Sequence, residues 1–281
     1  MSIKLMYITN DKAIARLAES VGIERIFVDL EYLGKAERQK NFNSFISNHK
    51  IEDVSIVRKA ISLSKLLVRV NPINPESKEE IDKVINRGAD IVMLPMFTTA
   101  DEVKDFIRFV NRRAKVLLLL ETGKAVENLN EILSLNGIDE IHLGLNDLRI
   151  TMRLKFIFES LSNGIVDFIV KKIKSKGIDF GFGGIGRMGE GELPARMILA
   201  EHYRLGSKMV ILSRSFKGNR DYKELAESNW LKQEIRKIRD EERRLICWKE
   251  EQFEENRKKV IKSVNRIIEV KNEKSLIHSD T

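Results

Sequence analysis

The sequence predicts an α/β fold, a (β/α)8 TIM barrel with a C-terminal helical extension. Eight short apolar runs alternate with longer segments of helical periodicity within residues 1–220. The runs are apolar throughout and do not alternate with polar residues, as expected of parallel strands buried on both faces. Strands that alternate with helices in this number are typical of the TIM barrel.

The first part of the chain supplies the strands and helices in regular order. Strands are expected at residues 4–9, 25–30, 65–71, 90–96, 115–122, 140–145, 179–184 and 208–216. Helices are expected between them, among others at residues 11–22, 77–88, 99–113, 126–137 and 194–206. Several of these segments begin at Ser, Thr or Asp and end at Gly, as helix caps do. An open doubly wound sheet is the alternative, but it requires a glycine-rich turn where the chain reads ITNDKA.

We therefore expect residues 1–220 to form a catalytic barrel domain and residues 221–281 to form a separate extension. The chain contains neither Gly nor Pro from Asn219 to its end. Apolar residues recur there at helical spacing, which predicts one long or two successive amphipathic helices (Leu231, Ile235, Ile238, Val260, Val264, Ile267). Such helices, with a barrel already covered, are expected to pack on a second subunit and make the protein a homo-oligomer.

Composition favours a soluble cytoplasmic protein. Of 281 residues 42% are hydrophobic, enough for one large domain or two smaller ones. The single cysteine, Cys247, excludes a disulfide within the chain and suits a reducing compartment. The N-terminal segment is polar within ten residues and predicts no signal peptide, and the longest apolar run, VLLLL, is too short to cross a bilayer.

The net charge of +8 does not indicate a nucleic-acid partner. Bases and acids are interleaved along nearly the whole chain. Residues 221–274 carry 15 Lys or Arg against 13 Asp or Glu, which is typical of a solvated surface of mixed charge. We expect neither nucleic acid nor a membrane as a partner.

Two acids follow successive buried strands, Glu121 after the fifth strand and Asp147 after the sixth. The carboxyl ends of all barrel strands meet at one rim, and neighbouring strands lie about 4.8 Å apart. Two carboxylates placed so closely repel each other unless a positive charge lies between them. The sequence therefore predicts a site for Mg²⁺ or Mn²⁺, with coordination positions left for substrate and water.

Arg69 ends the third strand on the same rim. Its fork of donors suits a carboxylate or a developing enolate oxygen. The alternative for each of these charged residues is an ordinary salt bridge at the rim, such as one between Arg69 and Glu121.

The segment VLLLLETGKAVENLNEILSLNGIDEIHLGLNDL resembles the strand 5–helix 5–strand 6 signature of the HpcH/HpaI aldolase and citrate lyase β-subunit family. Three other segments resemble the same family: FVDLEYLGK its D-x-E turn, LLVRVN its arginine strand, and GADIVMLPMFTTADEV its fourth strand. The resemblance covers roughly residues 22–150, with a looser match beyond. It implies a metal-dependent carbon–carbon lyase or aldolase that acts on a small 2-oxo acid such as pyruvate or oxaloacetate through a metal-stabilised enolate.

By this resemblance Glu121 and Asp147 are metal ligands and Arg69 contacts the 2-oxo acid. The backbone N–H groups of Leu145 and Asn146 are candidate donors to the substrate carboxylate. Arg214, after the eighth strand, is a further candidate for binding a substrate anion, with a rim salt bridge as the alternative.

The chain departs from the family where the second strand ends. The aldolases carry a histidine after the D-x-E turn and the citrate lyases an aspartate, whereas this chain has Tyr32. Glutamine, frequent two residues before the metal-binding Glu, is replaced by Leu119. The catalytic candidates here are Asp29, Glu31 and Tyr32, with Glu31 either the base or, together with Asp29, orienting water on the metal; Asp29 as a strand-closing residue is the alternative.

Because of these departures, two other functions stay open. One is a citrate-lyase-like lyase that takes a CoA ester as substrate, and the other is a non-catalytic barrel with a binding or assembly role. The glycine-rich segment GFGGIGRMGEGE suits either a phosphate or CoA site or a set of tight turns. His49 is expected in a loop or at a helix cap, His142 in the core, and His202 in a helix far from the rim.

Overall fold

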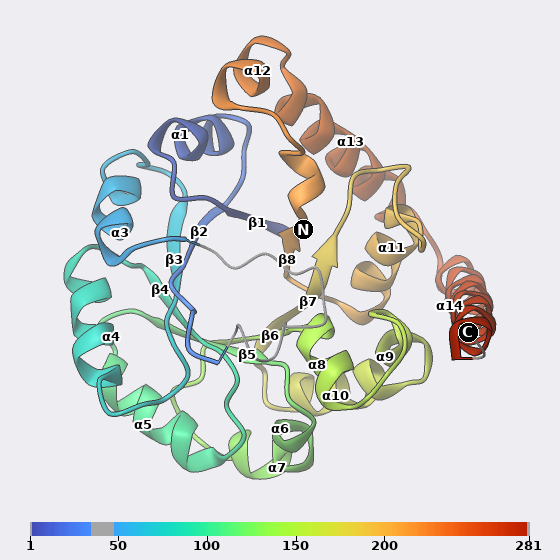
Figure 1. Ribbon diagram of the computed structural model, residues 1–281, viewed down its shortest axis with the longest axis horizontal. Coiled ribbons are helices and arrows are strands. Elements are labelled where there is room, and N and C mark those ends of the chain that lie inside the picture. Colours follow the sequence, from blue (N-terminus) through green and yellow to red (C-terminus); the bar gives the residue numbers. More distant parts are fainter. Residues whose placement is uncertain (1, 35–47, 280–281) are drawn as a thin grey trace.

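Eight parallel strands close into a barrel in the computed structural model, which describes residues 2–34 and 48–279. Each strand pairs with the next in sequence order, and the last pairs with the first. This confirms the predicted TIM barrel (Figure 1). The strands are β1 (Lys4–Ile8), β2 (Arg25–Asp29), β3 (Lys65–Arg69), β4 (Ile91–Leu94), β5 (Lys115–Leu120), β6 (Glu140–Leu143), β7 (Asp179–Ile185) and β8 (Met209–Leu212).

Helices surround this barrel and are followed by C-terminal helices (Figure 1). The first group comprises α1 (Lys12–Ser20), α3 (Ile51–Arg58), α4 (Ser77–Asn86), α5 (Ala100–Val110), α6 (Gly123–Glu127), α7 (Leu129–Ile132), α8 (Leu145–Thr151), α9 (Glu159–Ser162), α10 (Ile165–Ser175) and α11 (Ala195–Leu205). After β8 come a short 3-10 turn, η1 (Arg214–Phe216), and α12 (Tyr222–Glu227), α13 (Trp230–Leu245) and α14 (Glu250–Ser279). No helix within residues 2–34 and 48–279 combines the length and apolar content needed to cross a membrane.

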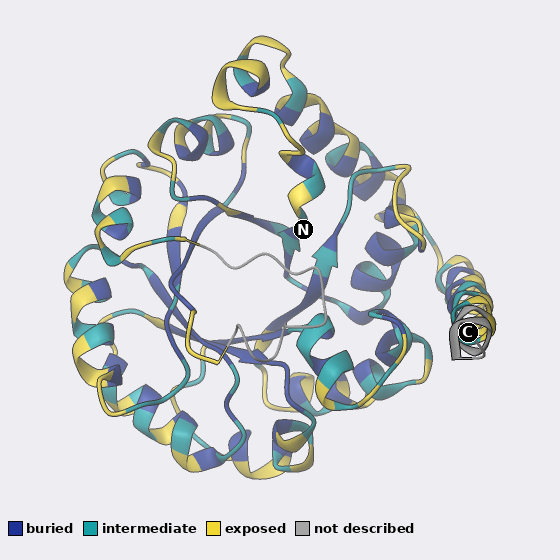
Figure 2. Ribbon diagram, in the orientation of Figure 1, coloured by how far each residue is buried: buried dark blue, intermediate teal, exposed yellow. Residues whose placement is uncertain are grey.

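Both faces of the strands are buried, which explains their continuous apolar runs (Figure 2). One set of strand residues fills the inside of the barrel (Met6, Phe27, Leu67, Ile91, Met93, Leu117, Leu119, Met209). The alternate residues belong to the larger cluster between the strands and the surrounding helices. An inward-facing polar residue must therefore lie at one end of the barrel or find a partner inside it.

The helix starts follow the capping chemistry that the sequence predicts. The Asp11 carboxylate accepts from the N–H groups of Ala13 and Ile14 at the start of α1. Thr99 and Glu102 form a reciprocal capping box at the start of α5. The single helix predicted at residues 126–137 is wrong, because the chain forms two short helices, α6 and α7, that meet at Asn128. The Asn128 side chain donates to the Thr98 carbonyl at 2.8 Å, which ties this junction to the preceding loop.

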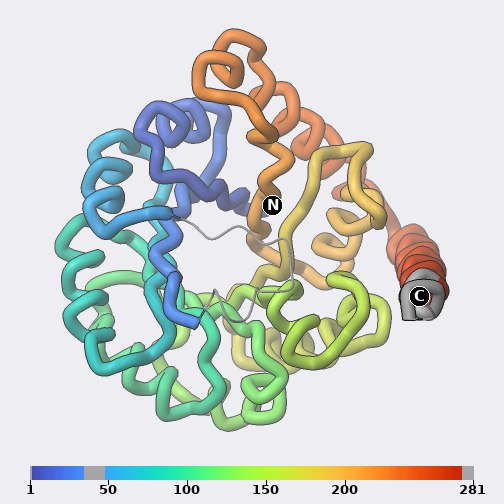
Figure 3. Tube along the Cα trace, viewed as in Figure 1, coloured from blue at the N-terminus to red at the C-terminus, as the bar shows by residue number. Residues whose placement is uncertain are grey.

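The C-terminal helices cover their own barrel. Their predicted apolar face is buried at Leu231, Ile235 and Ile238 in α13 and at Val260 and Val264 in α14. Helix α14 lies outside the ring of barrel helices, against α11 and α9 (Figures 1 and 3). The apolar stripe that suggested a second subunit is thus buried within the chain, and oligomerisation stays a prediction, as does the domain boundary at residue 220.

An ion pair crosses the base of the barrel between β2 and β6. The Arg25 guanidinium donates to both oxygens of the Glu140 carboxylate, at 2.6 and 2.7 Å, and both side chains are buried. The charge and hydrogen bonds of Arg25 outweigh burial and lower the pKa of Glu140. The pair thus satisfies two charges that would each be costly to bury alone.

Two histidines are fully buried, as the sequence predicts for His142, and both lie away from the rim acids. His142 in β6 donates from Nε2 to the Gly183 carbonyl at 2.9 Å. His202 in α11 stacks on Phe182 with ring centroids 3.7 Å apart, and its Nδ1 lies 2.8 Å from the Ser207 hydroxyl. Burial lowers the pKa of His142 to about 4 and that of His202 to about 3.

These histidines should make the fold sensitive to mild acid. Both rings stay neutral when folded, whereas in the unfolded chain they gain a proton near pH 6.5, so stability present above pH 6.5 is lost as the pH falls towards 4. Each pKa unit corresponds to about 1.4 kcal/mol of unfolding free energy. Urea unfolding between pH 7.5 and 4.5 should show a steeper loss for the wild type than for His202→Gln. If the unfolding free energy of the wild type and of His202→Gln fell equally with pH, this would contradict a neutral, buried His202 ring.

The basal ion pair should be far more costly to break than to replace. Glu140→Leu leaves the buried Arg25 charge without its carboxylate and should cost roughly 3–5 kcal/mol of unfolding free energy. The double variant Arg25→Met/Glu140→Leu removes both charges and should recover most of that loss. Chemical denaturation of the three proteins measures the difference. A double variant as unstable as Glu140→Leu would show that the pair stabilises the fold in some other way.

Candidate functional site

The rim at the carboxyl ends of the strands holds the predicted acids. Glu121 directly follows β5 and is only 3% exposed. Asp147 lies in the first turn of α8, which begins immediately after β6, and is half-buried. The two strands are paired, with Leu120 opposite Leu143, so they bring the two acids to neighbouring positions on the rim.

The Glu121 carboxylate is fixed by two features of the neighbouring backbone. The Met96 N–H donates to its Oε1 at 3.2 Å, from a residue with φ of 54°, in the left-handed region that non-glycine residues seldom adopt. Its Oε2 packs against Gly144, where a Cβ atom would lie only 2.5 Å away. The glycine between β6 and α8 is therefore required by the close approach of the carboxylate.

The electrostatics of this pair call for a positive charge. Burial, reinforced by the negative charge of Asp147, raises the pKa of Glu121 well above its usual range. Arg69 opposes this shift and Glu31 adds to it. Among the described residues, the Met96 N–H is the one hydrogen-bond donor to the Glu121 carboxylate. A hard cation between the acids would relieve both the repulsion and the missing donors, so their chemistry fits Mg²⁺ or Mn²⁺.

The acids do not belong to a larger cluster of ligands. Within residues 2–34 and 48–279, no group of three or more His, Cys, Asp and Glu side chains is arranged to hold a metal ion. Among the described residues, Glu121 and Asp147 are then the two acids that a cation here would contact, and the positions they leave can take water or substrate. This is the open coordination expected of a catalytic site and not of a structural one.

Arg69, at the end of β3, is held by the acids of the D-x-E turn. Its Nε and Nη2 donate to the two Asp29 oxygens, each at 2.8 Å, and its Nη1 lies 3.1 Å from a Glu31 oxygen. Burial would lower the pKa of Arg69, but the charges of Asp29 and Glu31 outweigh it and raise that pKa. The rim salt bridge is therefore formed with Asp29 and Glu31, while Arg69 acts on Glu121 through its charge.

Asp29 and Glu31 together hold the Arg69 guanidinium in position. A bidentate pair with Asp29 fixes the plane of the guanidinium, because both groups are planar forks. The Glu31 N–H also donates to Asp29 at 3.2 Å, which closes the turn after β2. Asp29 thus closes the turn, which was the alternative role considered for it, and also binds Arg69, while a role in orienting metal-bound water stays a prediction.

Tyr32 is turned away from these residues. Its side chain is 62% exposed and lines a hollow of about 270 Å³ together with His49, Asn71 and Glu80. The Tyr32 N–H donates to the Asn71 side chain at 3.0 Å, and Asn71 in turn donates to Glu80 at 2.8 Å. The structure therefore does not bring the Tyr32 hydroxyl together with Glu121 and Asp147.

His49 lies closer to the rim than its place in the sequence suggests. Its Nδ1 accepts from the Asp29 backbone N–H at 3.0 Å, just beyond the point where β1 pairs with β2. This contact places the proton of the neutral ring on Nε2. The expectation of a loop residue is met, but no local sequence signal could identify its partner 20 residues earlier.

The other predicted contacts lie around the same rim. The Leu145 side chain is buried against Gly183, so only its backbone is available to a ligand. The N-cap Gly144 has no side chain to accept from the first-turn N–H groups of α8, which include that of Asn146. Arg214 is exposed directly after β8.

The glycine-rich segment begins inside β7 and continues past the end of that strand. Residues 181–185 are in the strand, with a register shift against β8 between Gly181 and Gly184. A Cβ atom at Gly181 would lie 2.2 Å from the Met209 carbonyl. Close strand packing thus explains Gly181, and the idea of a phosphate loop applies only to the residues after Ile185.

Solved structures share this fold at low sequence identity. An HpcH/HpaI aldolase from Desulfitobacterium hafniense DCB-2 is 16% identical, with 84% of this chain and 93% of that one covered and a TM-score of 0.56. An HpcH/HpaI aldolase/citrate lyase family protein from Burkholderia cenocepacia J2315 is 15% identical over 84% and 95%, with a TM-score of 0.59. The citrate synthase SbnG is 16% identical over 81% and 91%, with a TM-score of 0.60.

The sequence comparisons identify a family for this chain, although they match no individual curated protein. The family model described as HpcH/HpaI aldolase/citrate lyase matches residues 5–157, which run from β1 to beyond α8 and include every rim acid discussed above. The chain therefore belongs to the HpcH/HpaI aldolase/citrate lyase family.

Proposed function

We propose that this protein is a divalent-metal-dependent carbon–carbon lyase or aldolase that acts on a 2-oxo acid of the pyruvate or oxaloacetate type. The observation that carries the proposal is the pair of acids, the buried Glu121 and the half-buried Asp147, at the rim where Arg69 is also held. The family supports a lyase reaction, and the geometry supports an oxygen-rich cation site beside a positively charged fork.

Glu121 and Asp147 would hold the metal, Mg²⁺ or Mn²⁺. When bound, such a cation polarises a keto oxygen and lowers the free energy of the enolate that forms when a C3 proton or the C3–C4 bond is lost. The protein contributes the burial of Glu121, its fixed approach to Gly144, and its hydrogen bond from Met96. These contacts set the direction of the carboxylate before any ligand arrives.

Arg69 would bind the negative oxygens of the substrate. A guanidinium has five N–H donors, and the contacts with Asp29 and Glu31 engage three of them. One donor on each terminal nitrogen is left for a substrate carboxylate or enolate oxygen. The first-turn N–H groups at Leu145 and Asn146 would add donors from the other side of the acid pair, and Arg214 would face the outer part of a longer substrate.

We assign the proton transfer to Glu31 instead of Tyr32. The Glu31 carboxylate lies at the rim, 3.1 Å from Arg69, whereas the Tyr32 side chain is exposed on the outer hollow. Asp29 would act as a positioning residue, since it binds two nitrogens of Arg69. The aldolase histidine that Tyr32 replaces is thus not compensated by the tyrosine hydroxyl.

One observation favours a second candidate, a citrate-lyase-like lyase with a CoA ester as substrate. The outward position of Tyr32 removes the acid–base group of the aldolases but leaves Asp29, Glu31 and Arg69 in place. A non-catalytic binding or assembly barrel is the remaining alternative, and it gives no reason for two converging buried acids.

We also propose that the protein is a cytoplasmic homo-oligomer. Exposed apolar side chains persist on the extension, at Ile246 after α13 and Val270 in α14, and these could pack on a second copy. The exposed thiol of Cys247 suits a reducing compartment. The substrate is a small molecule under this proposal, without a nucleic-acid or membrane partner.

The enolate step can be tested without knowing the second substrate. The enzyme should exchange the C3 protons of pyruvate for deuterium in D₂O when Mg²⁺ or Mn²⁺ is present, and should not do so without either metal. Proton NMR measures the remaining C3 protons after the reaction is stopped by chelation of the metal. Glu121→Gln removes one metal ligand and should slow exchange by at least about 100-fold. Glu127→Gln, an exposed acid on α6, serves as the control and should exchange like the wild type.

Two results would count against the proposal. Absence of exchange with either metal would remove pyruvate as the substrate and direct the search to CoA esters. Unchanged exchange in Glu121→Gln would remove this acid from the chemistry, whatever the substrate.

A further inference from the structure

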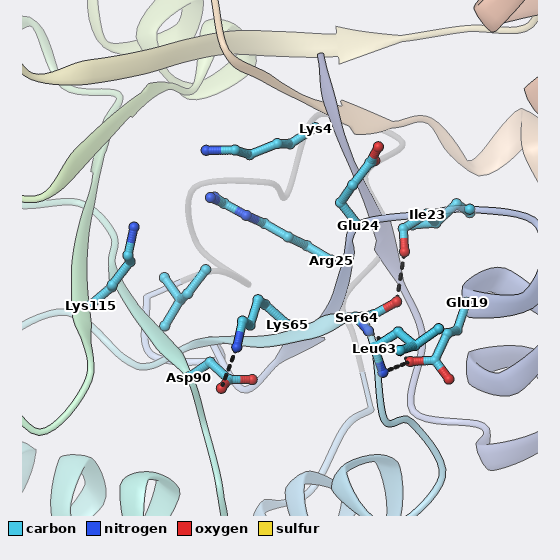
Figure 4. A pocket seen from close by; sticks show the side chains of 12 residues that line it. Lys4, Glu19, Ile23, Glu24, Arg25, Leu63, Ser64, Lys65, Asp90 and Lys115 are labelled. Carbon is cyan, nitrogen blue, oxygen red and sulfur yellow. Dashed lines mark hydrogen bonds and ion pairs between the residues drawn. The ribbon is translucent and has the colours of Figure 1, made fainter. Parts of the chain in front are cut away.

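A second hollow lies at the opposite end of the barrel from the acid pair. Its volume is about 610 Å³, and it opens among the amino ends of the strands (Figure 4). Its lining includes four basic side chains from four strands, Lys4 of β1, Arg25 of β2, Lys65 of β3 and Lys115 of β5. Figure 4 shows Lys4, Arg25 and Lys115 extending into the same space.

The acid in the middle of this group is already satisfied. Both Glu140 oxygens accept short hydrogen bonds from Arg25. The ammonium groups of Lys4 and Lys115 lie farther away, at 3.9 and 3.6 Å from the same Glu140 oxygen. One buried carboxylate thus faces three cations, although Arg25 alone neutralises its charge.

The other acids that line the hollow accept hydrogen bonds from groups other than its lysines, although Asp90 also pairs with Lys65 at 3.6 Å (Figure 4). Asp90 accepts from the Leu66 N–H and from Arg58, both at 2.8 Å. Glu24 accepts from the Leu5 N–H at 2.8 Å and from Arg239 at 2.5 Å. Glu19 accepts from the three successive backbone N–H groups of residues 62–64. Each of these carboxylates has closer donors of its own, and the shortest ion pairs of the lysines are longer, at 3.6 Å for Lys65 and Lys115 and 3.8 Å for Lys4.

The three lysines keep their donors available. Lys65 lies 3.6 Å from Asp90, and Lys4 lies 3.8 Å from the half-exposed Asp179. In the part of the chain that the structure describes, the contacts of the Lys4, Lys65 and Lys115 ammonium groups with acids are ion pairs of 3.6 Å or longer. Each ammonium has three N–H donors. Like charges that converge on one hollow repel each other unless an anion lies between them.

We propose that this basal hollow binds the phosphate group of a small molecule. Lysines act on phosphate as point charges that approach a tetrahedral anion from different directions, whereas a planar carboxylate is better matched by an arginine fork. Lys4, Lys65 and Lys115 come from three strands and so surround the space from three sides. The exposed Leu63 side chain at the edge of the hollow provides an apolar contact for the remainder of such a ligand.

Binding of inorganic phosphate to the full chain tests this site directly. Isothermal titration without divalent cations, against chloride of equal ionic strength, should show saturable binding at one site. Lys65→Gln/Lys115→Gln removes two ammonium groups and should weaken binding at least about tenfold. Lys104→Gln, an exposed lysine on α5, and Glu121→Gln at the opposite rim should bind as the wild type does.

The variant side chains are 65% and 57% exposed, so the fold should be retained, and matching thermal unfolding midpoints would confirm this. If the double variant were unstable, Lys65→Gln and Lys115→Gln would be measured singly, each with a smaller loss of affinity expected. Unaltered phosphate affinity in these variants, or heats no larger than those of chloride, would overturn the proposal.

Discussion

The repulsion between two partly buried acids is the constraint on which the rim depends. Glu121 lies almost out of solvent beside Asp147, and burial and this neighbouring charge together raise its pKa. The surrounding backbone keeps the carboxylate where repulsion is greatest, with Gly144 leaving it room and Met96 donating from a strained conformation. Backbone strain and buried charges with shifted pKa values are concentrated at the functional sites of proteins.

The positive side of the rim is organised by a separate network. Asp29 and Glu31 hold Arg69 in a fixed plane, so the guanidinium cannot turn and neutralise Glu121 by a direct hydrogen bond. The acid pair and the cationic fork therefore remain distinct groups on the same rim. Under the proposed function, a cation would bind on one side and a substrate anion on the other.

The sequence predicts the barrel well because strand burial leaves a strong pattern, and the rim acids follow from strand ends. It fails where contacts join distant segments. The break at Asn128 depends on the Thr98 carbonyl, and His49 accepts from the backbone N–H of Asp29, 20 residues earlier in the chain. The apolar face that was expected to contact a second subunit is buried at Val260 and Val264 within the same chain, while oligomerisation itself stays a prediction. Likewise, the direction of Tyr32 depends on the Asn71 contact with its backbone, which no motif encodes.

The central claim, that the two acids form one cation site, is tested most directly by Mn²⁺ binding. Electron paramagnetic resonance of free Mn²⁺ during titration gives the number and affinity of sites without any substrate. A cation shared by the two acids should give one Mn²⁺ site per chain in the wild type and a large loss of affinity in both Glu121→Gln and Asp147→Asn. Equal Mn²⁺ binding by the wild type and both variants would contradict it, as would the absence of binding by the wild type.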